Sequence, residues 1–219
     1  MPPLTLVIGN KNYSSWSLRP WLAMRQTGIP FEEVRIPLYQ PESRAALEKW
    51  SPSGKVPALH DGKIAVWDSL AICETLAERF PDKRLWPVDA AARAIARAVS
   101  AEMHAGFAAL REHMSMNIRA RRPGRGRTPE CLADIARIQA IWTQCRTQYG
   151  DGGAFLFGDF SIADAMYAPV ILRFQTYGVT LAGSTRAYAE TMLALPALQD
   201  WMADAVAETE RIAQFEQDA

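Results

Sequence analysis

Hydrophobic positions in the first third of the chain switch between strand-length and helix-length patterns. The run LTLVIG at residues 4–9 has the length of a buried strand, and a helical pattern follows it up to residue 28. Because Pro20 is tolerated in the first turn of a helix, we expect this helix to begin near residue 16 or 17. A second strand at residues 31–38 and a short helix at residues 43–50 come next. These segments predict a β-α-β-α unit.

A tight hairpin and a third helix complete this unit. Residues 56–68 hold two apolar runs on either side of Asp61-Gly62, a dipeptide that favours the positive backbone angles of a hairpin. Residues 69–80 then place apolar side chains at helical spacing, and Pro81 stops the pattern. The predicted order is therefore β-α-β-α-β-β-α, with the third and fourth strands antiparallel.

Strand-like runs almost disappear after residues 81–90, where prolines and charges are mixed. The rest of the chain is rich in alanine and has apolar stripes at helical spacing, which are typical of packed helices. We therefore predict two domains, at residues 1–81 and 90–219, the second of them all-helical. The residues in these stripes are Met103, Phe107, Leu110, Met114, Ile135, Ile138, Ile141 and Trp142.

The charges of the chain balance, with 24 lysines and arginines against 24 aspartates and glutamates. No long-range field is expected to attract nucleic acid or an anionic membrane. Five arginines fall between Arg119 and Arg127 without interleaved aromatic residues, so we interpret this segment as an exposed loop. The N-terminus lacks the pattern of a secretory signal and no window has the length of a membrane span, which predicts a cytoplasmic location.

Cysteines and histidines indicate neither a disulfide framework nor a metal site. The three cysteines are far apart and never form C-x-x-C, which is typical of reduced thiols. The three histidines lack the spacing of metal ligands on one helical face, so no metal is expected. These six residues are Cys73, Cys131, Cys145, His60, His104 and His113.

Hydroxyl side chains gather where the first helix is expected to begin. The segment NYSSWS places Ser14, Ser15 and Ser17 at this helix N-terminus, whose unpaired N–H groups stabilise an anion. A serine O–H would add a hydrogen bond to a thiolate, so this corner could lower the pKa of a bound thiol. The alternative is that the serines simply cap the helix.

Two further corners offer polar groups to a ligand. In GKVPAL, a cis Val56-Pro57 bond would turn the backbone N–H and C=O of Val56 towards an extended peptide. In WDSLAI, Asp68 and Ser69 occupy another helix N-terminus, which could bind a carboxylate while Asp68 takes up an ammonium group. An ordinary trans proline and a plain helix cap are the alternatives at these corners.

The order of SSWSLRPWL, GKVPAL and DSLAI in a β-α-β-α-β-β-α unit followed by helices resembles the glutathione S-transferase family over essentially the whole chain. This resemblance implies an α/β thioredoxin-like domain that binds glutathione and an all-α domain that contributes the electrophile site. It also implies a homodimeric enzyme that ionises the thiol of its cosubstrate glutathione for attack on a small hydrophobic electrophile. A glutathione-dependent isomerase, dehalogenase or peroxidase, or a non-catalytic glutathione-binding or scaffolding protein, is the alternative.

The resemblance also implies roles for particular residues. The serine-type classes, such as zeta and tau, place Ser14 at the catalytic serine and Arg19 at their usual arginine, with Ser15 the second candidate and Tyr13 the third. Trp16 stands where zeta enzymes have a cysteine. The implied glutathione-binding residues are Lys55, Val56, Pro57, Asp68 and Ser69. The implied electrophile-site residues, for most of which core packing is the alternative, are Trp16, Met103, His104, Phe107 and Arg111.

A separate motif lies in the second half of the chain. In FSIADAMYAPV, Ser161 and Asp164 have the spacing of a helix capping box, which the family uses in its C-terminal domain. We expect a structural role, because removing such a cap costs roughly 1 kcal/mol or more.

Overall fold

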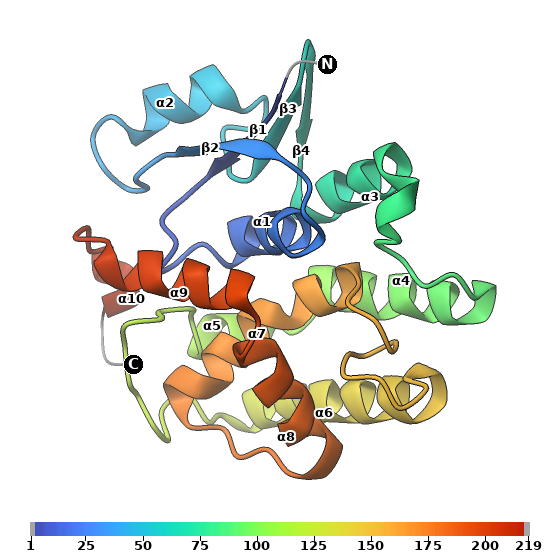
Figure 1. The fold of residues 1–219 in the computed structure, drawn as a ribbon. Coiled ribbons are helices and arrows are strands. Elements are labelled where there is room, and N and C mark those ends of the chain that lie inside the picture. The colour runs from blue at the N-terminus through green and yellow to red at the C-terminus, as the bar shows by residue number, and fades with distance from the viewer. Residues whose placement is uncertain (1–2, 217–219) are drawn as a thin grey trace.

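The computed structural model describes residues 3–216 and confirms the predicted order of the first unit (Figure 1). Strands and helices alternate and end in a hairpin and a third helix. The elements are β1 (Leu4–Ile8), α1 (Ser15–Thr27), β2 (Phe31–Arg35), α2 (Ser43–Trp50), β3 (Ala58–Asp61), β4 (Ile64–Trp67) and α3 (Ser69–Arg79).

These strands form one four-stranded sheet in the order β2-β1-β3-β4. The central strand β1 pairs with β2 in parallel, as a β-α-β crossover requires, and with β3 antiparallel. Strands β3 and β4 are antiparallel, with Asp61 opposite Ile64 and Gly62 in the left-handed region at φ 60°. The hairpin predicted from Asp61-Gly62 is therefore confirmed.

Helix α1 begins slightly earlier than the sequence predicted. Its first residue is Ser15, because the side chain of Ser14 accepts a hydrogen bond from the N–H of Ser17 and so caps the helix. Pro20 consequently lies in the second turn, where its missing N–H leaves the carbonyl of Trp16 without the usual helical donor. The cap therefore places Ser14 and Ser15 directly at the N-terminus of the helix.

Helices make up the second unit, as predicted. Among the described residues after β4, the only β pairings are isolated bridges near Phe155 and Phe157. The elements are the 3₁₀ helix η1 (Pro81–Lys83), α4 (Ala90–Ala105), α5 (Ala108–His113), α6 (Pro129–Tyr149), α7 (Ile162–Tyr177), α8 (Gly183–Leu193), α9 (Pro196–Ala207) and α10 (Ala213–Glu216). The predicted capping box of Ser161 and Asp164 is present at the start of α7.

The apolar stripe from Met103 to Met114 belongs to two helices instead of one. The chain leaves α4 at Gly106, and Phe107 takes the left-handed conformation at φ 60° before α5 begins. Met103, Phe107 and Met114 are nevertheless all buried. The stripe therefore marks the core correctly, although the helical register does not continue through it.

One hydrophobic cluster extends through both units. It includes Leu6 from the sheet, Leu22 from α1 and Ile72 from α3, together with buried side chains of α7 such as Val170. Helix α1 lies between the sheet and the helical unit in Figure 1 and packs against α7. A smaller cluster joins the other face of the sheet to α2. The start of α1 is therefore fixed from both units.

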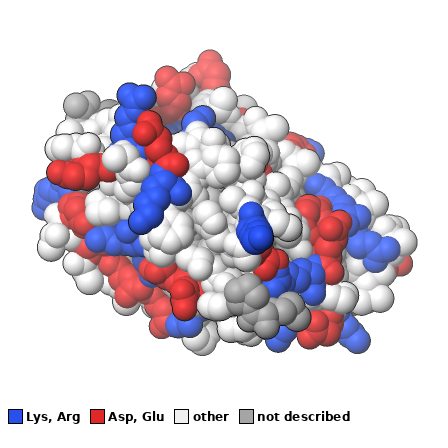
Figure 2. All heavy atoms as spheres, turned by 90° about the horizontal axis from the view of Figure 1, so that it is seen from above, with Lys and Arg blue, Asp and Glu red and all other residues white. Residues whose placement is uncertain are grey.

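The surface carries charges of both signs, which are interspersed on the face in Figure 2. Most of the segment from Arg119 to Arg127 is exposed, as expected, but Arg119 and Arg122 are half-buried and donate hydrogen bonds to the C-terminal segment. No helix within residues 3–216 is long and apolar enough to cross a membrane.

Candidate active site

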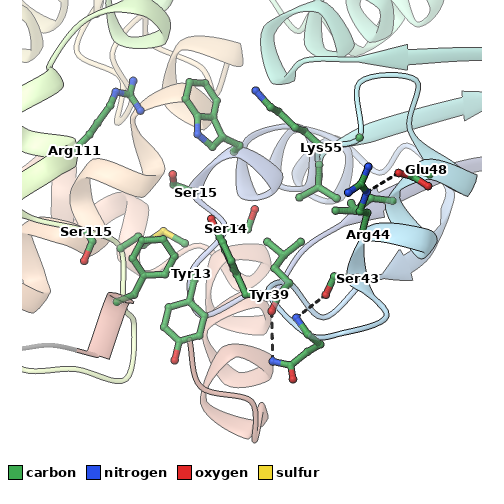
Figure 3. A pocket seen from close by; sticks show the side chains of 18 of the residues that line it. Tyr13, Ser14, Ser15, Tyr39, Ser43, Arg44, Glu48, Lys55, Arg111 and Ser115 are labelled. Carbon is green, nitrogen blue, oxygen red and sulfur yellow. Dashed lines mark hydrogen bonds and ion pairs between the residues drawn. The ribbon is translucent and has the colours of Figure 1, made fainter. Parts of the chain in front are cut away.

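A cavity of about 740 Å³ opens at the beginning of α1. This volume suits a small organic ligand. Figure 3 shows Ser14 and Ser15 in its middle, between Arg111 and Ser115 of the helical unit and Arg44 and Lys55 of the first unit. The full lining is Tyr13, Ser14, Ser15, Trp16, Leu38, Tyr39, Gln40, Ser43, Arg44, Leu47, Glu48, Gly54, Lys55, Val56, Arg111, Ser115, Met116, Arg173 and Phe215.

Buried hydroxyl groups form a short chain below the cavity. The Oγ atoms of Ser14 and Ser17 lie 2.7 Å apart, and Ser17 Oγ accepts a hydrogen bond from the N–H of Gly9 at 3.1 Å. In this contact Ser14 donates and Ser17 Oγ accepts, so Ser17 Oγ receives hydrogen bonds from both Ser14 and Gly9. Because a hydroxyl hydrogen rotates about its C–O bond, the hydrogen of Ser14 can turn from Ser17 towards a group in the cavity.

The hydroxyl of Ser15 has a different partner. It accepts a hydrogen bond from Arg173 Nη2 at 3.2 Å, and Arg173 also donates to the carbonyl of Met114. Burial, followed by the positive charge of Arg111, lowers the pKa of Arg173 to about 10, so it remains a cation at neutral pH. Ser15 therefore holds this cation at the cavity wall.

Two guanidinium groups lie over the ring of Trp16. The centre of Arg19 is 4.3 Å from the ring centroid, and that of Arg111 is 4.9 Å from it. The ring of His104 packs edge-on at 5.3 Å. Such cation–π contacts hold the indole in one orientation beside the serine pair.

Arg19 is fully buried although it has few polar partners. Its Nη1 approaches Ser69 Oγ at 3.4 Å, while Nε and Nη2 have no hydrogen-bond partner among the described residues. Burial, with the charges of Arg111 and Arg173, lowers its pKa to about 9. These cations give the beginning of α1 a positive potential in addition to that of the helix end, which favours an anion.

The hydroxyl of Tyr13, the third candidate, is occupied by the C-terminal segment. It accepts hydrogen bonds from Arg119 Nη2 at 2.8 Å and from the N–H of Ile212 at 3.4 Å, and it donates to the carboxylate of Glu216. Burial and the contact with Glu216 raise the pKa of Tyr13. The Tyr13 hydroxyl therefore already has three hydrogen-bond partners within the chain.

The residues implied for glutathione binding are divided between the cavity and its surroundings. Lys55 and Val56 line the cavity, and the Val56-Pro57 bond is cis, as the resemblance implied. Pro57 is buried beneath the lining. Asp68 and Ser69 lie at the start of α3 and are not among the cavity-lining residues.

Asp68 acts as the cap of α3, the alternative that sequence reasoning left open. Its Oδ1 accepts hydrogen bonds from the N–H groups of Leu70 at 2.9 Å and Ala71 at 3.2 Å. Its Oδ2 lies 3.2 Å from His104 Nε2. Burial lowers the pKa of His104, so the histidine is a neutral hydrogen-bond partner at neutral pH.

The residues implied for the electrophile site are also separated. Trp16 and Arg111 line the cavity, whereas Met103, His104 and Phe107 do not. Met103 and Phe107 are instead buried in the hydrophobic core. His104 reaches the site only through its contacts with Trp16 and Asp68.

Sequence reasoning missed Arg173 and Phe215, which both line the cavity. Arg173 had a signal, since it is a single cation within the apolar run of α7, a helix buried along almost its whole length. Phe215 had none, because it lies in a short helix near the end of the chain. Among residues 3–216, no group of three or more His, Cys, Asp or Glu side chains could hold a metal ion.

The fold and the site define a two-part class of protein, with a thioredoxin-like unit followed by a helical unit. A model of the glutathione S-transferase N-terminal domain matches residues 13–79, and a model of the C-terminal domain of the same family matches residues 88–204. The chain therefore belongs to the glutathione S-transferase family. The family and the enzyme class predicted from the sequence, a glutathione transferase, are confirmed.

Similar proteins include a probable maleylacetoacetate isomerase of Caenorhabditis elegans, which is 27% identical over 70% of this chain and 73% of its own length. A glutathione transferase homologue from Burkholderia, solved with bound glutathione, superposes with a TM-score of 0.71 at 22% identity over 94% of this chain and all of its own. A bacterial maleyl pyruvate isomerase of the zeta class gives a TM-score of 0.71 at 23% identity, over 95% and 100% of the two chains. These structures confirm the predicted fold.

Proposed function

We propose that this enzyme binds glutathione with its first unit, residues 1–81, and an electrophile with its helical unit, residues 90–219. The observation that supports this most strongly is the cavity itself, in which the serine pair at the start of α1 lies between cationic side chains of both units (Figure 3). The division into two domains explains why a cosubstrate and a second substrate can be held by different walls of one cavity.

In this proposal the hydroxyl of Ser14 activates the thiol of glutathione. The Ser14 hydroxyl, which donates to Ser17 Oγ at 2.7 Å in this structure, turns into the cavity and donates its hydrogen to the sulfur. A hydrogen bond to a charged group contributes about 1.5 to 3 kcal/mol, which corresponds to a thiol pKa lowered by about one to two units. The thiol proton passes to water, and the thiolate attacks the electrophilic carbon, so that a carbon–sulfur bond forms while the bond from this carbon to a leaving group, such as chloride, breaks.

The first unit offers matching groups for the rest of the tripeptide. We propose that Lys55, Val56 and Pro57 hold its middle and glycyl end, and that Asp68 and Ser69 hold its γ-glutamyl end. The ammonium group of glutathione would then take the place of His104 on Asp68 Oδ2, since that oxygen is the one not used to cap α3. Ser15 acts beside Ser14 by holding Arg173.

Two measurements on the purified protein test this function. We expect retention on immobilised glutathione and conjugation of 1-chloro-2,4-dinitrobenzene in the presence of the free tripeptide. Retention without any turnover would support the alternative of a non-catalytic binding protein. The absence of both retention and turnover would contradict the proposed function.

A glutathione-dependent isomerase that acts on an acid is the second candidate. Arg111 and Arg173 line the cavity, and their guanidinium groups donate to uncharged oxygens, such as the carbonyls of Gly106 and Met114 and the hydroxyl of Ser15. An anionic group on the electrophile would give these cations a charged partner in the cavity. The names of two similar proteins, isomerases of maleylacetoacetate and of maleyl pyruvate, agree with this reading.

Replacement of Arg173 tests whether the electrophile carries a carboxylate. We expect Arg173→Gln to lower kcat/KM for 4-chloro-3-nitrobenzoate about 10-fold or more relative to the methyl ester of the same acid, because a buried ion pair is lost only with the acid. Steady-state rates with the two compounds give this ratio directly. Arg25→Gln, which alters an exposed arginine outside the cavity, should leave the ratio unchanged. An equal loss with acid and ester would contradict the role of Arg173.

The homodimer implied by the family resemblance remains a proposal, as does the cytoplasmic location. It is supported by two large apolar side chains on the edge strand β4, since Ile64 is 63% exposed and Trp67 is 48% exposed. We expect light scattering to give twice the mass of one chain and Trp67→Glu to shift the protein towards monomer. A wild-type protein that is monomeric at micromolar concentration would contradict the proposal.

A further inference from the structure

The loop between β1 and α1, residues 9–14, carries Ser14 to the cavity, and we call it the serine loop. Its backbone makes a turn in which the carbonyl of Asn10 accepts hydrogen bonds from the N–H groups of Tyr13 at 3.2 Å and Ser14 at 2.8 Å. The position of Ser14 therefore depends on what holds the residues at the start of this turn. The residue that follows Asn10 is Lys11.

The side chain of Lys11 is buried, with only 5% of the residue exposed, which is unusual for a lysine. Its Nζ atom lies 2.7 Å from Asp204 Oδ2 in α9 and 2.9 Å from Glu33 Oε1 in β2. The same atom lies 4.9 Å from the ring centroid of Trp21 and 5.4 Å from that of Trp201. Because a buried charge is tolerated only with such partners, these contacts hold the side chain in one place.

The backbone of Lys11 is held by the same part of the molecule. Its carbonyl accepts a hydrogen bond from Nε1 of the fully buried Trp201 at 3.0 Å. Its N–H donates to the carboxylate of Glu208, directly after α9, at 2.6 Å. Side chain, carbonyl and N–H of this one residue are thus each bound by α9 or by the residue after it. Helix α9 itself packs against α1 (Figure 1).

These contacts lie outside the cavity that holds the serine pair. Lys11 and Asp204 are not among its lining residues and instead line a different cavity, of about 490 Å³, together with Glu33. Lys11 is therefore not placed to touch glutathione or an electrophile. Any effect that it has on the reaction must pass through the backbone of the serine loop, in which Ser14 is three residues away.

We propose that Lys11 is a positioning residue, through which α9 holds the serine loop so that the Ser14 hydroxyl can reach the sulfur of glutathione. This inference rests on the proposed function, because it assigns the support of the same hydroxyl. A hydrogen bond weakens steeply when its donor is misaligned, and a displacement of about 1 Å near a reacting group can lower a rate about 100-fold. A donor that is already fixed needs no reorganisation when the thiolate forms.

Replacing Lys11 by methionine tests the inference, because Lys11→Met keeps an unbranched apolar side chain and removes the ammonium group. We expect the thiol pKa of bound glutathione, measured by difference absorbance against pH, to rise by about 0.5 to 1 unit. The value of kcat/KM for conjugation at pH 6.5 should then fall about threefold to 10-fold, since less of the thiol is ionised. S-methylglutathione has no thiol to ionise, so its Kd by isothermal titration calorimetry should change by less than about twofold.

Two carboxylates of α9 provide a second variant and a matched control. Asp204→Asn removes the charge that faces Lys11 and should raise the thiol pKa in the same direction by a smaller amount. Asp200 lies one helical turn earlier and is 3.7 Å from Arg25 of α1 instead of the serine loop. Asp200→Asn should therefore change the thiol pKa by less than about 0.3 unit.

The outcomes separate the inference from the proposed function. A wild-type protein that ionises bound glutathione, with Lys11→Met giving the same thiol pKa, would overturn the inference alone. A shift in Asp200→Asn as large as that in Lys11→Met would also overturn it, because the effect would then not be specific to the serine loop. If Lys11→Met does not fold, an unchanged thiol pKa in Asp204→Asn would overturn the inference instead. Failure of the wild-type protein to bind reduced glutathione would overturn the proposed function, and the inference with it.

Discussion

Replacing Ser14 by alanine is expected to lower kcat/KM for glutathione conjugation about 30-fold to 100-fold at pH 6.5. The variant loses the hydroxyl that caps α1 and that the proposal assigns to the sulfur. The thiol pKa in the complex should rise towards that of free glutathione, since the hydrogen bond favours the thiolate alone. Difference absorbance of the bound thiolate, recorded against pH, measures this shift.

Three further variants make this result specific. Ser17→Ala removes the oxygen that accepts the hydrogen of Ser14, so it leaves this hydrogen free for the sulfur and should not raise the thiol pKa. Ser15→Ala should act chiefly on the electrophile, through Arg173. Ser115→Ala removes a hydroxyl from the opposite wall and should change kcat/KM by less than about twofold. If the pH profile of Ser14→Ala matches that of wild type, Ser14 does not activate the thiol.

The largest effect on stability is expected for Asp164→Ala, at about 3 to 5 kcal/mol in the free energy of unfolding. The buried carboxylate of Asp164 accepts hydrogen bonds from the N–H of Leu156 at 3.1 Å, the N–H of Ser161 at 2.8 Å and the hydroxyl of Ser161 at 3.0 Å. Its removal leaves three buried donors without an acceptor. Urea denaturation followed by circular dichroism gives the free energy.

This loss exceeds the roughly 1 kcal/mol of an ordinary helix cap, because Asp164 also joins the preceding loop to α7. Ser161→Ala removes one of the three donors and should cost less, about 1 kcal/mol. The exposed carboxylate of Asp159 provides a control, with an expected change below about 0.5 kcal/mol for Asp159→Ala. A loss below 1 kcal/mol for Asp164→Ala would mean that the carboxylate acts as a surface cap only.

The order of elements could be predicted because it depends on local patterns. The apolar run of β1, the helical spacing of α3 and the Asp61-Gly62 hairpin each act within about a dozen residues. The start of α1 was predicted one or two residues late, since the Ser14 cap outweighs the preference of Pro20 for the first turn. The left-handed turn at Phe107 has no comparable local signal.

Those residues of the candidate site that come from a single short motif could be predicted from the sequence. The serine pair, Lys55 and Val56 lie in such motifs and do line the cavity. Arg173 and Phe215 reach the same cavity from the helical unit, and only tertiary packing brings them there. Residues that long-range contacts bring to a site leave no periodic pattern in the sequence. The cavity-lining residues of the helical unit were therefore predicted only in part.

The hydrophobic cluster that runs from the sheet through α1 into α7 joins the two units through a shared core. Domains that swing about a hinge meet through small, polar interfaces, whereas these two meet through buried apolar side chains. Substrates must therefore enter and products leave by local motion at the cavity mouth instead of by rotation of whole domains. Under the proposed function, the spacing between a bound thiolate and an electrophile is then set by a rigid frame, and a new substrate range can arise by exchanging wall side chains while that frame stays the same.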